Sequence, residues 1–321
     1  MEPTGPVVSV VVATFNRAER LARLLRALAG QTLDPARFEV VIVDDCSTDE
    51  TPDVLADAVE RGELALRTLR HAANEGRAKA REDGWRIAAA DLIAFTDDDC
   101  VPDAGWLEAG LAASVANPGT IVQGRTDPDP AELDRIGPFT RTVSVAAYDP
   151  AFQTCNILYP RGVLEKVGGF DVEAFGRVHG GEDSDLAWRA IKGGAGAVFV
   201  PEALVHHAVN ELGARGKLRL CAGWSLLAYA RHPELRRAHF VSPLFWKQTH
   251  VWLARAMIGL VLPRRLWPLK IWLALPWLRS LHARGKLEGG GPALAPFYAA
   301  CDAAEMYAAM RNSVEHRTLM L

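Results

Sequence analysis

Cysteine is scarce in this sequence and follows no metal-binding pattern. Five cysteines are scattered over 321 residues and are never spaced as CxxC. The scattered positions and the odd number of cysteines argue against a disulfide framework and against a structural zinc site. We expect the five thiols to be small buried side chains of a protein that works in a reducing compartment.

Targeting and glycine-rich phosphate-binding segments are also missing. The amino terminus, MEPTGPVVSVVVATF, has no basic region followed by an apolar run and a cleavage site. We therefore expect neither a signal peptide nor a signal anchor, and a chain that stays in the cytoplasm. No GxGxxG follows the first apolar run, which argues against a dehydrogenase. The segment ATFNRAER also lacks the Gly-rich, Lys-containing loop expected of a nucleotidyltransferase.

Acidic residues are nearly absent from one long segment. Residues 212–287 contain 14 of the 36 lysines and arginines but only one acid, Glu234, whereas the remainder holds 22 basic and 38 acidic residues. With 49% hydrophobic and 23% charged residues, the chain can bury a large core. The contrast in charge predicts two domains, residues 1–211 and residues 212–321.

Strand and helix patterns alternate in the first domain. Apolar runs predict strands at residues 7–13, 38–43, 64–69 and 92–96, with helices between them at about 17–28, 51–60 and 74–90. Asn16 is a candidate cap for the first helix. Later patterns predict a helix at 103–116, a strand near Ile121, a helix from Glu182 and a strand ending near His207. Runs of this kind imply an α/β fold with a mostly parallel sheet covered on both faces.

Polar residues follow three of these strands, at residues 14–17, 44–49 and 97–99. Ligands of parallel sheets bind at the carboxyl ends of the strands. The carboxylates of the second group can accept hydrogen bonds from a base N–H or from ribose hydroxyls. Asp97-Asp98-Asp99 can hold a hard divalent cation that neutralises a diphosphate. Acidic clusters also form solvated turns and calcium loops, so that interpretation of the triplet stays open.

Two predicted helix starts carry further polar groups. Asn74-Glu75-Gly76-Arg77 offers N–H donors and a cation to a diphosphate, although Asn74 could serve only as an N-cap. Gly180-Gly181-Glu182-Asp183 opens another helix, where acids also suit the helix dipole. Transfer to a hydroxyl needs a carboxylate base, for which Asp183 is the first candidate and Glu182 the second.

Two adjacent histidines, His206 and His207, end a predicted strand about 24 residues after those carboxylates. A lone histidine on an apolar run is more often a satisfied core group than a ligand. A neutral imidazole is nevertheless a good metal ligand beside a carboxylate.

Taken in order, these motifs resemble those of the family 2 glycosyltransferases of the GT-A fold, over about residues 7–207. SVVVATFNR resembles the opening strand and loop, VDDCSTDET the nucleotide-binding turn, FTDDDCVP the DxD element and GGEDSDLAWR the motif with the base. Phe15 stands where a tyrosine is common, so stacking on a base can persist without a phenol hydrogen bond.

The resemblance implies an inverting, metal-dependent transfer of a sugar from a nucleotide-diphosphate sugar to a hydroxyl acceptor. The cofactor would be Mn²⁺ or Mg²⁺, held by Asp99, Asp97 and His207, with Asp99 the most direct ligand. Asn156, in TCNILYPRGVLEKVGGFD, and Gly181 would lie on the acceptor side. The predicted donor-binding residues are Thr14, Phe15, Arg17, Asp44, Asp45, Asn74, Gly76, Arg77, Asp97 and Asp98.

The second domain is rich in tryptophan and basic residues. Its longest apolar stretches, residues 251–262 and 266–278, contain Arg255 or Lys270. They are shorter than the ~20 residues of a spanning helix. Short apolar helices flanked by Trp, Arg and Lys suit the headgroup region of an anionic bilayer. We therefore expect a peripheral protein at the inner face of the cell membrane, acting on a lipid-linked or cell-envelope glycan.

Alternatives remain for each of these interpretations. The helices of the second domain could instead pack on the first domain or on a second subunit, so an oligomer stays open. The chain could be a catalytically silent, membrane-bound scaffold that keeps only sugar-nucleotide binding, or a nucleotidyltransferase. No nucleic-acid partner is expected.

Overall fold

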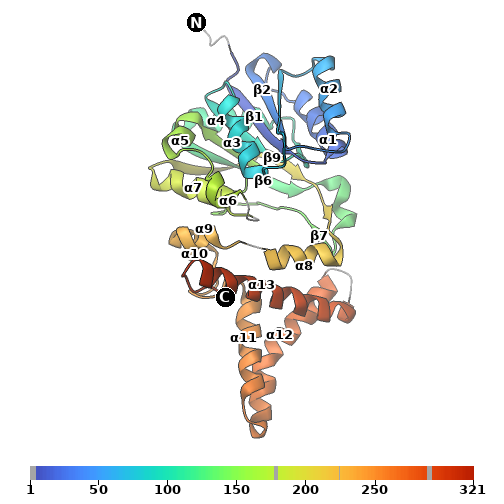
Figure 1. Cartoon of the computed structure of the whole chain (residues 1–321), viewed down its shortest axis with the longest axis vertical. Coiled ribbons are helices and arrows are strands. Elements are labelled where there is room, and N and C mark those ends of the chain that lie inside the picture. Colours follow the sequence, from blue (N-terminus) through green and yellow to red (C-terminus); the bar gives the residue numbers. More distant parts are fainter. Residues whose placement is uncertain (1–4, 177–179, 224, 288–290) are drawn as a thin grey trace. The chain divides into compact units, whose positions relative to one another are not determined.

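The computed structural model describes residues 5–176, 180–223, 225–287 and 291–321. Its contacts divide the chain into two compact units (Figure 1). The sheet unit comprises Met1–Leu133, Thr142–Arg177 and Glu182–Ala208, and the helical unit comprises Asp134–Arg141, Val178–Gly181 and Val209–Leu321. Two short pieces from the first two thirds of the chain therefore belong with the C-terminal helices.

An eight-stranded sheet with the order β3-β2-β1-β4-β8-β6-β9-β5 forms the centre of the sheet unit. The pairs among β1 to β4 and the pair β6–β9 are parallel, whereas β8 and β5 run antiparallel to their neighbours. The predicted α/β fold with a mostly parallel sheet is confirmed. The strands are β1 (Val8–Thr14), β2 (Phe38–Asp44), β3 (Leu66–Arg70), β4 (Leu92–Thr96), β5 (Cys100–Pro102), β6 (Thr120–Pro128), β8 (Asn156–Pro160) and β9 (Gly196–His207).

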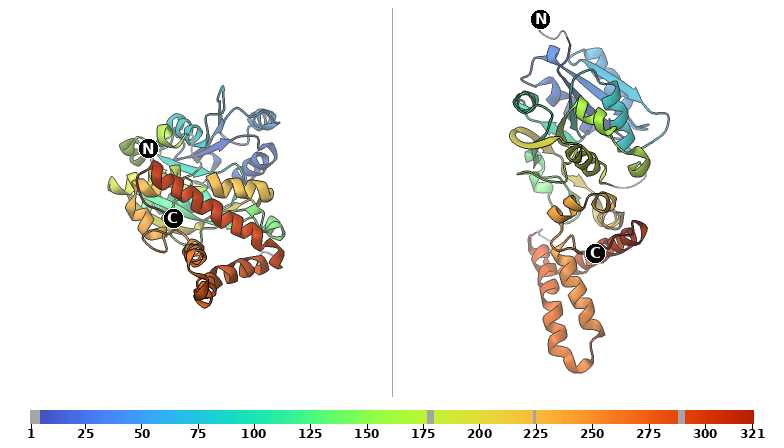
Figure 2. Two further views of the ribbon diagram at one scale, coloured as in Figure 1. Left: turned by 60° about the horizontal axis from the view of Figure 1, so that its bottom comes forward. Right: turned by 90° about the vertical axis from the view of Figure 1, so that its left-hand side faces the viewer.

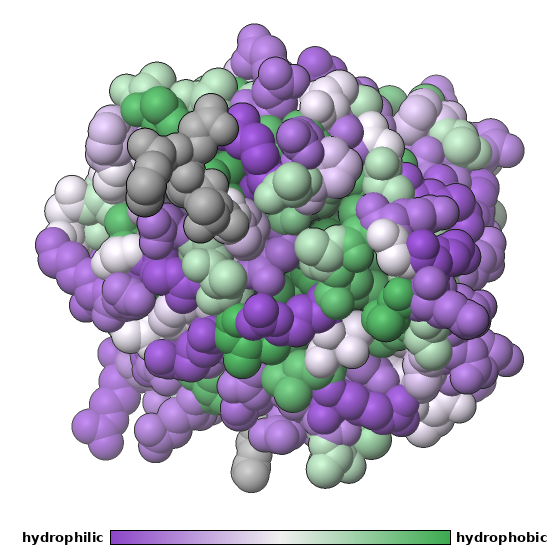
Figure 3. All heavy atoms as spheres, turned by 90° about the horizontal axis from the view of Figure 1, so that it is seen from above, coloured by the Kyte–Doolittle hydropathy of each residue, from purple (hydrophilic) through white to green (hydrophobic). Residues whose placement is uncertain are grey.

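Helices cover both faces of this sheet. Because side chains alternate along a strand, Val10 and Val12 of β1 pack into one core layer with Leu24, whereas Val11 packs into the other with Trp85. The surface of the molecule seen from above in Figure 3 is mostly hydrophilic, with apolar residues gathered between the polar ones. The helices are α1 (Ala18–Ala29), α2 (Thr51–Arg61), α3 (Arg77–Ile87), α4 (Trp106–Ala116), α5 (Arg161–Val167), α6 (Val172–Phe175) and α7 (Glu182–Lys192), with short 3-10 turns η1 (Pro35–Arg37) and η2 (Pro130–Arg135).

Two expected helix caps differ in the structure. Arg17 rather than Asn16 occupies the N-cap position of α1, and Asn16 has a φ of 54°. Asn74 does not cap α3, which begins at Arg77 after an N-cap at Gly76. In both cases the asparagine bonds to a neighbouring loop instead of to its own helix. All five cysteines are free, and burial is confirmed for each except Cys46, which is half-buried.

The helical unit consists of one short strand pair and six helices among its described residues. β7 (Thr140–Arg141) pairs antiparallel with β10 (Asn210–Glu211). Helices α11 and α12 lie side by side as a hairpin (Figure 2). None of the described helices combines the length and the hydropathy needed to cross a bilayer. The helices are α8 (Gly213–Gly223), α9 (Leu227–Arg231), α10 (Pro233–His239), α11 (Gln248–Val261), α12 (Trp267–Leu287) and α13 (Ala295–Glu315), with 3-10 turns η3 (Arg264–Leu266) and η4 (Gly291–Leu294).

Candidate functional site

Sheet register brings the aspartate triplet to a histidine. Asp97, Asp98 and Asp99 lie in the turn between β4 and β5, and the next residue, Cys100, pairs with His207 at the end of β9. The distance from Asp99 Oδ1 to His207 Nε2 is 3.6 Å. Two residues separated by more than a hundred positions thus share the same edge of the sheet.

The atoms around Asp99 suit a divalent cation. Asp99, Cys100 and His207 each offer one ligand atom, and these atoms all lie within 4.8 Å of one another. His207 Nδ1 lies 2.9 Å from the carbonyl oxygen of Ala208, so the tautomer that donates there leaves Nε2 free to bind a metal. A carboxylate with a neutral imidazole is a donor set that Mn²⁺ accepts. His206 pairs with Val101 instead, which favours His207 as the ligand.

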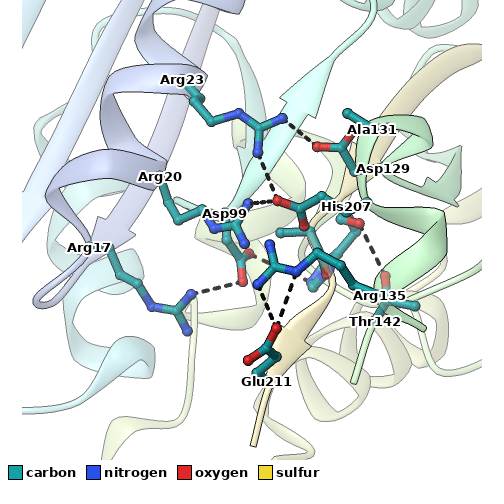
Figure 4. Close-up of polar contacts among 12 residues, drawn as sticks. Arg17, Arg20, Arg23, Asp99, Asp129, Ala131, Arg135, Thr142, His207 and Glu211 are labelled. Carbon is teal, nitrogen blue, oxygen red and sulfur yellow. Dashed lines mark hydrogen bonds and ion pairs between the residues drawn. The ribbon is translucent and has the colours of Figure 1, made fainter. Parts of the chain in front are cut away.

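Three arginines of the β1–α1 region approach this edge of the sheet (Figure 4). The Arg17 Nη1 atom lies 3.3 Å from Asp99 Oδ2. One and two turns further along, Arg20 and Arg23 both pair with the buried carboxylate of Glu132. Arg23 also pairs with Asp129, whose backbone N–H donates to the carbonyl of His207 at 2.8 Å. The two pairs formed by Arg23 therefore fix the chain that borders His207.

Asp98 is held by a residue at the end of the neighbouring strand. Thr14, the last residue of β1, donates from Oγ1 to Asp98 Oδ2 at 2.8 Å. Burial, together with the charge of Asp99, raises the pKa of Asp98 to about 7, although Arg17 and the Thr14 hydroxyl oppose that rise. Thr14 and Asp98 therefore lie close together, as the sequence predicts for residues at the ends of neighbouring strands. Their contacts with a donor stay predictions.

A buried arginine connects the triplet to the start of α7. Arg81 Nη2 donates to Asp97 Oδ1 at 2.6 Å, and its Nη1 donates to Glu182 Oε1 at 3.0 Å. Only 5% of the Arg81 side chain is exposed. Arg77 adds a second guanidinium on Glu182. One planar cation therefore holds two carboxylates from different motifs in a fixed relation.

The two acids at the start of α7 differ in their surroundings. Burial would raise the pKa of Glu182, but Arg77 and Arg81 hold it below its usual value. Burial and the neighbouring charge of Glu182 raise the pKa of Asp183 to about 7. When their surroundings push the pKa values of two neighbouring carboxyls apart in this way, one carboxyl suits an electrostatic role and the other an acid–base role. Asp183 has the properties of a proton acceptor near neutral pH.

The backbone before α7 is suited to glycine. Gly180 and Gly181 have φ values of 89° and 97°, a region that side chains rarely enter. Asp183 Oδ1 accepts from the backbone N–H of Ser184 at 2.8 Å. The sharp turn of the two glycines therefore leads directly into the helix that carries both acids.

Asp45 braces the segment that precedes α3. Its two carboxylate oxygens accept from the backbone N–H groups of Glu75 and Gly76 at 2.8 and 2.7 Å. The imidazole of His71 lies 2.7 Å from Asp45 and 3.1 Å from Asp83. Gly76 has a φ of 90°, which again favours glycine. The described contacts of Asp45 thus shape the loop, and its contact with a donor base stays a prediction.

The loops after β1 and β2 are tied together by Asn16. Its side-chain oxygen accepts from the backbone N–H groups of Thr48 and Asp49, and its own N–H donates to Ser47 Oγ. Phe15, next to it, is 43% exposed. An exposed aromatic ring on a fixed loop is available for stacking on a flat base.

Asp44, another predicted donor residue, and Asn156 lie deeper than a ligand contact suggests. Asp44 is 1% exposed and pairs with Arg70 at 3.1 Å. Asn156 is 2% exposed, accepts from Trp106 Nε1, and donates to the carbonyls of Arg125 and Ala203. Both donor hydrogens of the Asn156 amide are therefore used within the core. A contact between Asn156 and a sugar stays a prediction that these bonds do not favour.

Asn74 donates from Nδ2 to the carbonyl of Asp45 at 3.3 Å, and its contact with a donor stays a prediction. The sequence did not single out Arg81, His71 or Arg23 as site residues. Each is an ordinary polar residue in its own segment, and each meets its partners only across the fold. A signal for Arg81 did exist, because it lies one turn after Arg77 and would share its helix face.

Comparison with known proteins gives the family. The model of the family described as glycosyl transferase family 2 matches residues 9–170. The chain belongs to glycosyl transferase family 2. The pre-mycofactocin glycosyltransferase of Mycobacterium tuberculosis is 31% identical over 224 aligned positions, and the match covers 64% of this chain and 44% of that protein. The validoxylamine A glucosyltransferase of Streptomyces hygroscopicus subsp. limoneus is 27% identical over 299 residues, covering 81% and 62%. This family 2 chain therefore spans less than two thirds of the length of either relative.

Solved structures share the fold of this family 2 member. A mannosyltransferase from Pyrobaculum calidifontis, in complex with GDP-Man and Mn²⁺, gives a TM-score of 0.63 at 23% identity, covering 97% of this chain and 88% of that one. TarS 1-349 of S. aureus, in complex with UDP-GlcNAc, gives 0.57 at 17% identity, covering 97% and 92%. The predicted GT-A-type fold is thereby confirmed.

Proposed function

We propose that the chain catalyses inverting, metal-dependent transfer of a sugar from a nucleotide-diphosphate sugar to a hydroxyl acceptor. The observation that carries the proposal is the joint arrangement of Asp99 beside His207 and of Asp183 beside Glu182, with Arg81 between the two groups. A hydroxyl acceptor needs a base on one side of the sugar and charge neutralisation on the other. The mannosyltransferase and TarS structures, which contain GDP-Man and UDP-GlcNAc, support a nucleotide-sugar donor.

Asp99 and His207 would hold the metal, with Asp97 nearby under the control of Arg81. A bound Mn²⁺ or Mg²⁺ would supply neutralising charge to the leaving diphosphate. The nucleotide would be oriented by Phe15, Thr14, Arg17, Asp98 and the loop braced by Asp45. Arg77 would stay close to Glu182.

Asp183 would take the proton of the acceptor hydroxyl as that oxygen attacks the anomeric carbon. Glu182 stays ionised because of its two arginines, and its charge keeps Asp183 a stronger base than a free aspartate. In a single displacement the configuration at the anomeric carbon is inverted, because the acceptor oxygen enters on the side opposite the leaving diphosphate. Gly181 gives the start of α7 the backbone freedom to present this carboxylate.

Metal-dependent donor binding tests the proposal. We expect one of a panel of nucleoside diphosphates and their sugars to bind in calorimetry with Mn²⁺ and to lose at least tenfold in affinity with EDTA. Asp99→Asn should produce a similar loss in the presence of Mn²⁺. Glu108→Gln, a change on the exposed side of α4, is the matched control and should bind as the wild type does. Binding that ignores both EDTA and Asp99→Asn would contradict a metal-assisted donor site.

The rate should depend on pH through Asp183. Only the deprotonated carboxylate accepts a proton, so kcat/KM should fall about tenfold per pH unit below a pKa near 7 and level off above it. Thr14→Val separates this group from Asp98, since it removes a hydrogen bond that lowers the pKa of Asp98. The acid limb should stay in place in Thr14→Val; a shift of the limb would assign it to Asp98.

The acceptor would be lipid-linked or a cell-envelope glycan, reached by a peripheral protein at the inner face of the cell membrane. The basic, tryptophan-rich composition of residues 212–287 supports this part of the proposal. It also supports retaining residues 212–321 as a separate helical extension of a catalytic domain at 1–211. A catalytically silent scaffold remains the second candidate, and the calorimetric and pH measurements distinguish the two.

A further inference from the structure

The α11–α12 hairpin buries few of its large apolar side chains. α11 buries four of its 14 residues, and α12 buries only Leu281 and Gly285 among its 21. Around the turn, Leu260 is 80% exposed, Val261 83% and Trp267 63%. Isolated exposed apolar residues are ordinary, but a contiguous group at one end of a hairpin indicates an interaction surface.

The hairpin is tied to α13 by polar contacts at its base. Trp277 Nε1 donates to Asp302 at 2.9 Å, and Lys247 Nζ donates to Glu305 at 2.7 Å. Towards the turn, the two helices hold each other: a Cβ on Gly259 would lie 3.5 Å from the Lys270 backbone. The segment of residues 257–272, which we call the hairpin tip, thus has a defined shape without covering its apolar residues.

Charge in the hairpin has one sign. Residues 248–287 contain seven lysines and arginines and no aspartate or glutamate. Arg264 and Arg265 lie exposed in the turn itself, and Arg255 stacks over the ring of Trp272 at 4.7 Å. A surface that combines cations, tryptophan and aliphatic residues is complementary to anionic headgroups over acyl chains.

On α12 the exposure runs around the helix rather than along one face. Trp267 and Leu269 are both exposed and point to nearly opposite sides, because residues two positions apart on a helix are about 200° apart. A folded protein partner would cover one face and leave the others in water, whereas lipid can surround the tip. Each helix contributes only about one and a half turns to the tip, roughly 8 Å, which suits the ~5–10 Å interfacial layer and not a ~30 Å hydrocarbon core.

We propose that the hairpin tip docks the protein on an anionic lipid bilayer by entering the interfacial layer of one leaflet. This deepens the proposed function, on which it rests for the idea that a membrane-held acceptor is presented there. It also revises the sequence-based picture of two separate helices lying along the surface: the structure makes the turn between them, with Arg264 and Arg265, the contact point.

Flotation with vesicles tests this surface in the full-length chain without any donor or acceptor. We expect most of the wild-type protein to float with vesicles of one third phosphatidylglycerol in phosphatidylcholine, and little with phosphatidylcholine alone. The variant Leu260→Ser/Val261→Ser/Trp267→Ser should bind at least tenfold more weakly. Arg264→Gln/Arg265→Gln should bind the anionic vesicles roughly 25-fold more weakly, at about fivefold per cation.

The matched control is Val115→Ser/Val314→Ser, two similarly exposed apolar residues at 71% and 81% that lie outside the tip. It should float as the wild type does. The proposal is overturned if the wild type binds neither vesicle, if the triple variant binds unchanged, or if sedimentation shows a dimer that the triple variant dissolves. Metal-dependent donor binding is measured separately on the same variants, so loss of membrane docking and loss of the donor site are distinguishable.

Discussion

Asp183→Asn should lower the rate of sugar transfer by about 10²–10⁴-fold while donor affinity stays within about twofold of the wild type. The asparagine oxygen can still accept from the Ser184 N–H, which keeps the helix start intact, but the amide cannot take a proton. The pKa of about 7 that burial and Glu182 give to Asp183 is lost with the carboxyl. Initial rates at saturating donor, with calorimetric donor binding alongside, measure both quantities.

A matched control for this variant is Glu173→Gln, which changes an exposed first-turn acid of α6 in the same way. It should leave both rate and binding unchanged. Equal loss of rate and of donor affinity in Asp183→Asn would reassign Asp183 to the donor site, and an unchanged rate would remove it from the reaction.

Replacing the buried arginine should cost most in stability. Arg81→Met leaves Asp97 and Glu182 without the guanidinium that joins them, although Arg77 stays on Glu182. Removing one partner from a buried ion pair destabilises by about 3–5 kcal/mol, because a charge remains unpaired in a poorly solvated place. Urea unfolding followed by tryptophan fluorescence should therefore show a much lower midpoint than in the wild type.

Lys79→Met is the control on the same helix, since Lys79 pairs with Asp83 at a site where both side chains are partly exposed. That pair should contribute no more than about 1 kcal/mol. Arg81→Lys should recover only part of the loss, since one ammonium lacks the planar fork that reaches two carboxylates. If Arg81→Met lowers the free energy of unfolding no more than Lys79→Met does, the contacts of Arg81 with Asp97 and Glu182 contribute no more to stability than an exposed ion pair.

Local patterns were sufficient for the elements of the sheet unit. The apolar runs of β1, β2 and β4 and the helical spacing in α1 and α2 appear within single segments, so their positions were predicted to within a few residues. The position of polar residues after those strands also follows from chain order alone. Two clear errors lie at helix starts, where Asn16 and Asn74 bond to other loops rather than cap their own helices.

The sequence by itself determined the family, the α/β fold and the order of the acidic motifs, because these depend on periodicity and on residues close together in the chain. Only the tertiary structure decided which groups meet. The register of β5 and β9 sets His207 beside Asp99, and packing of α3 under the sheet places Arg81 between Asp97 and Glu182. The tertiary structure also places Asn156 in the core, where its side chain forms hydrogen bonds with three groups distant in sequence. Contacts of this kind depend on how strands and helices pack across long sequence separations, which no local pattern encodes.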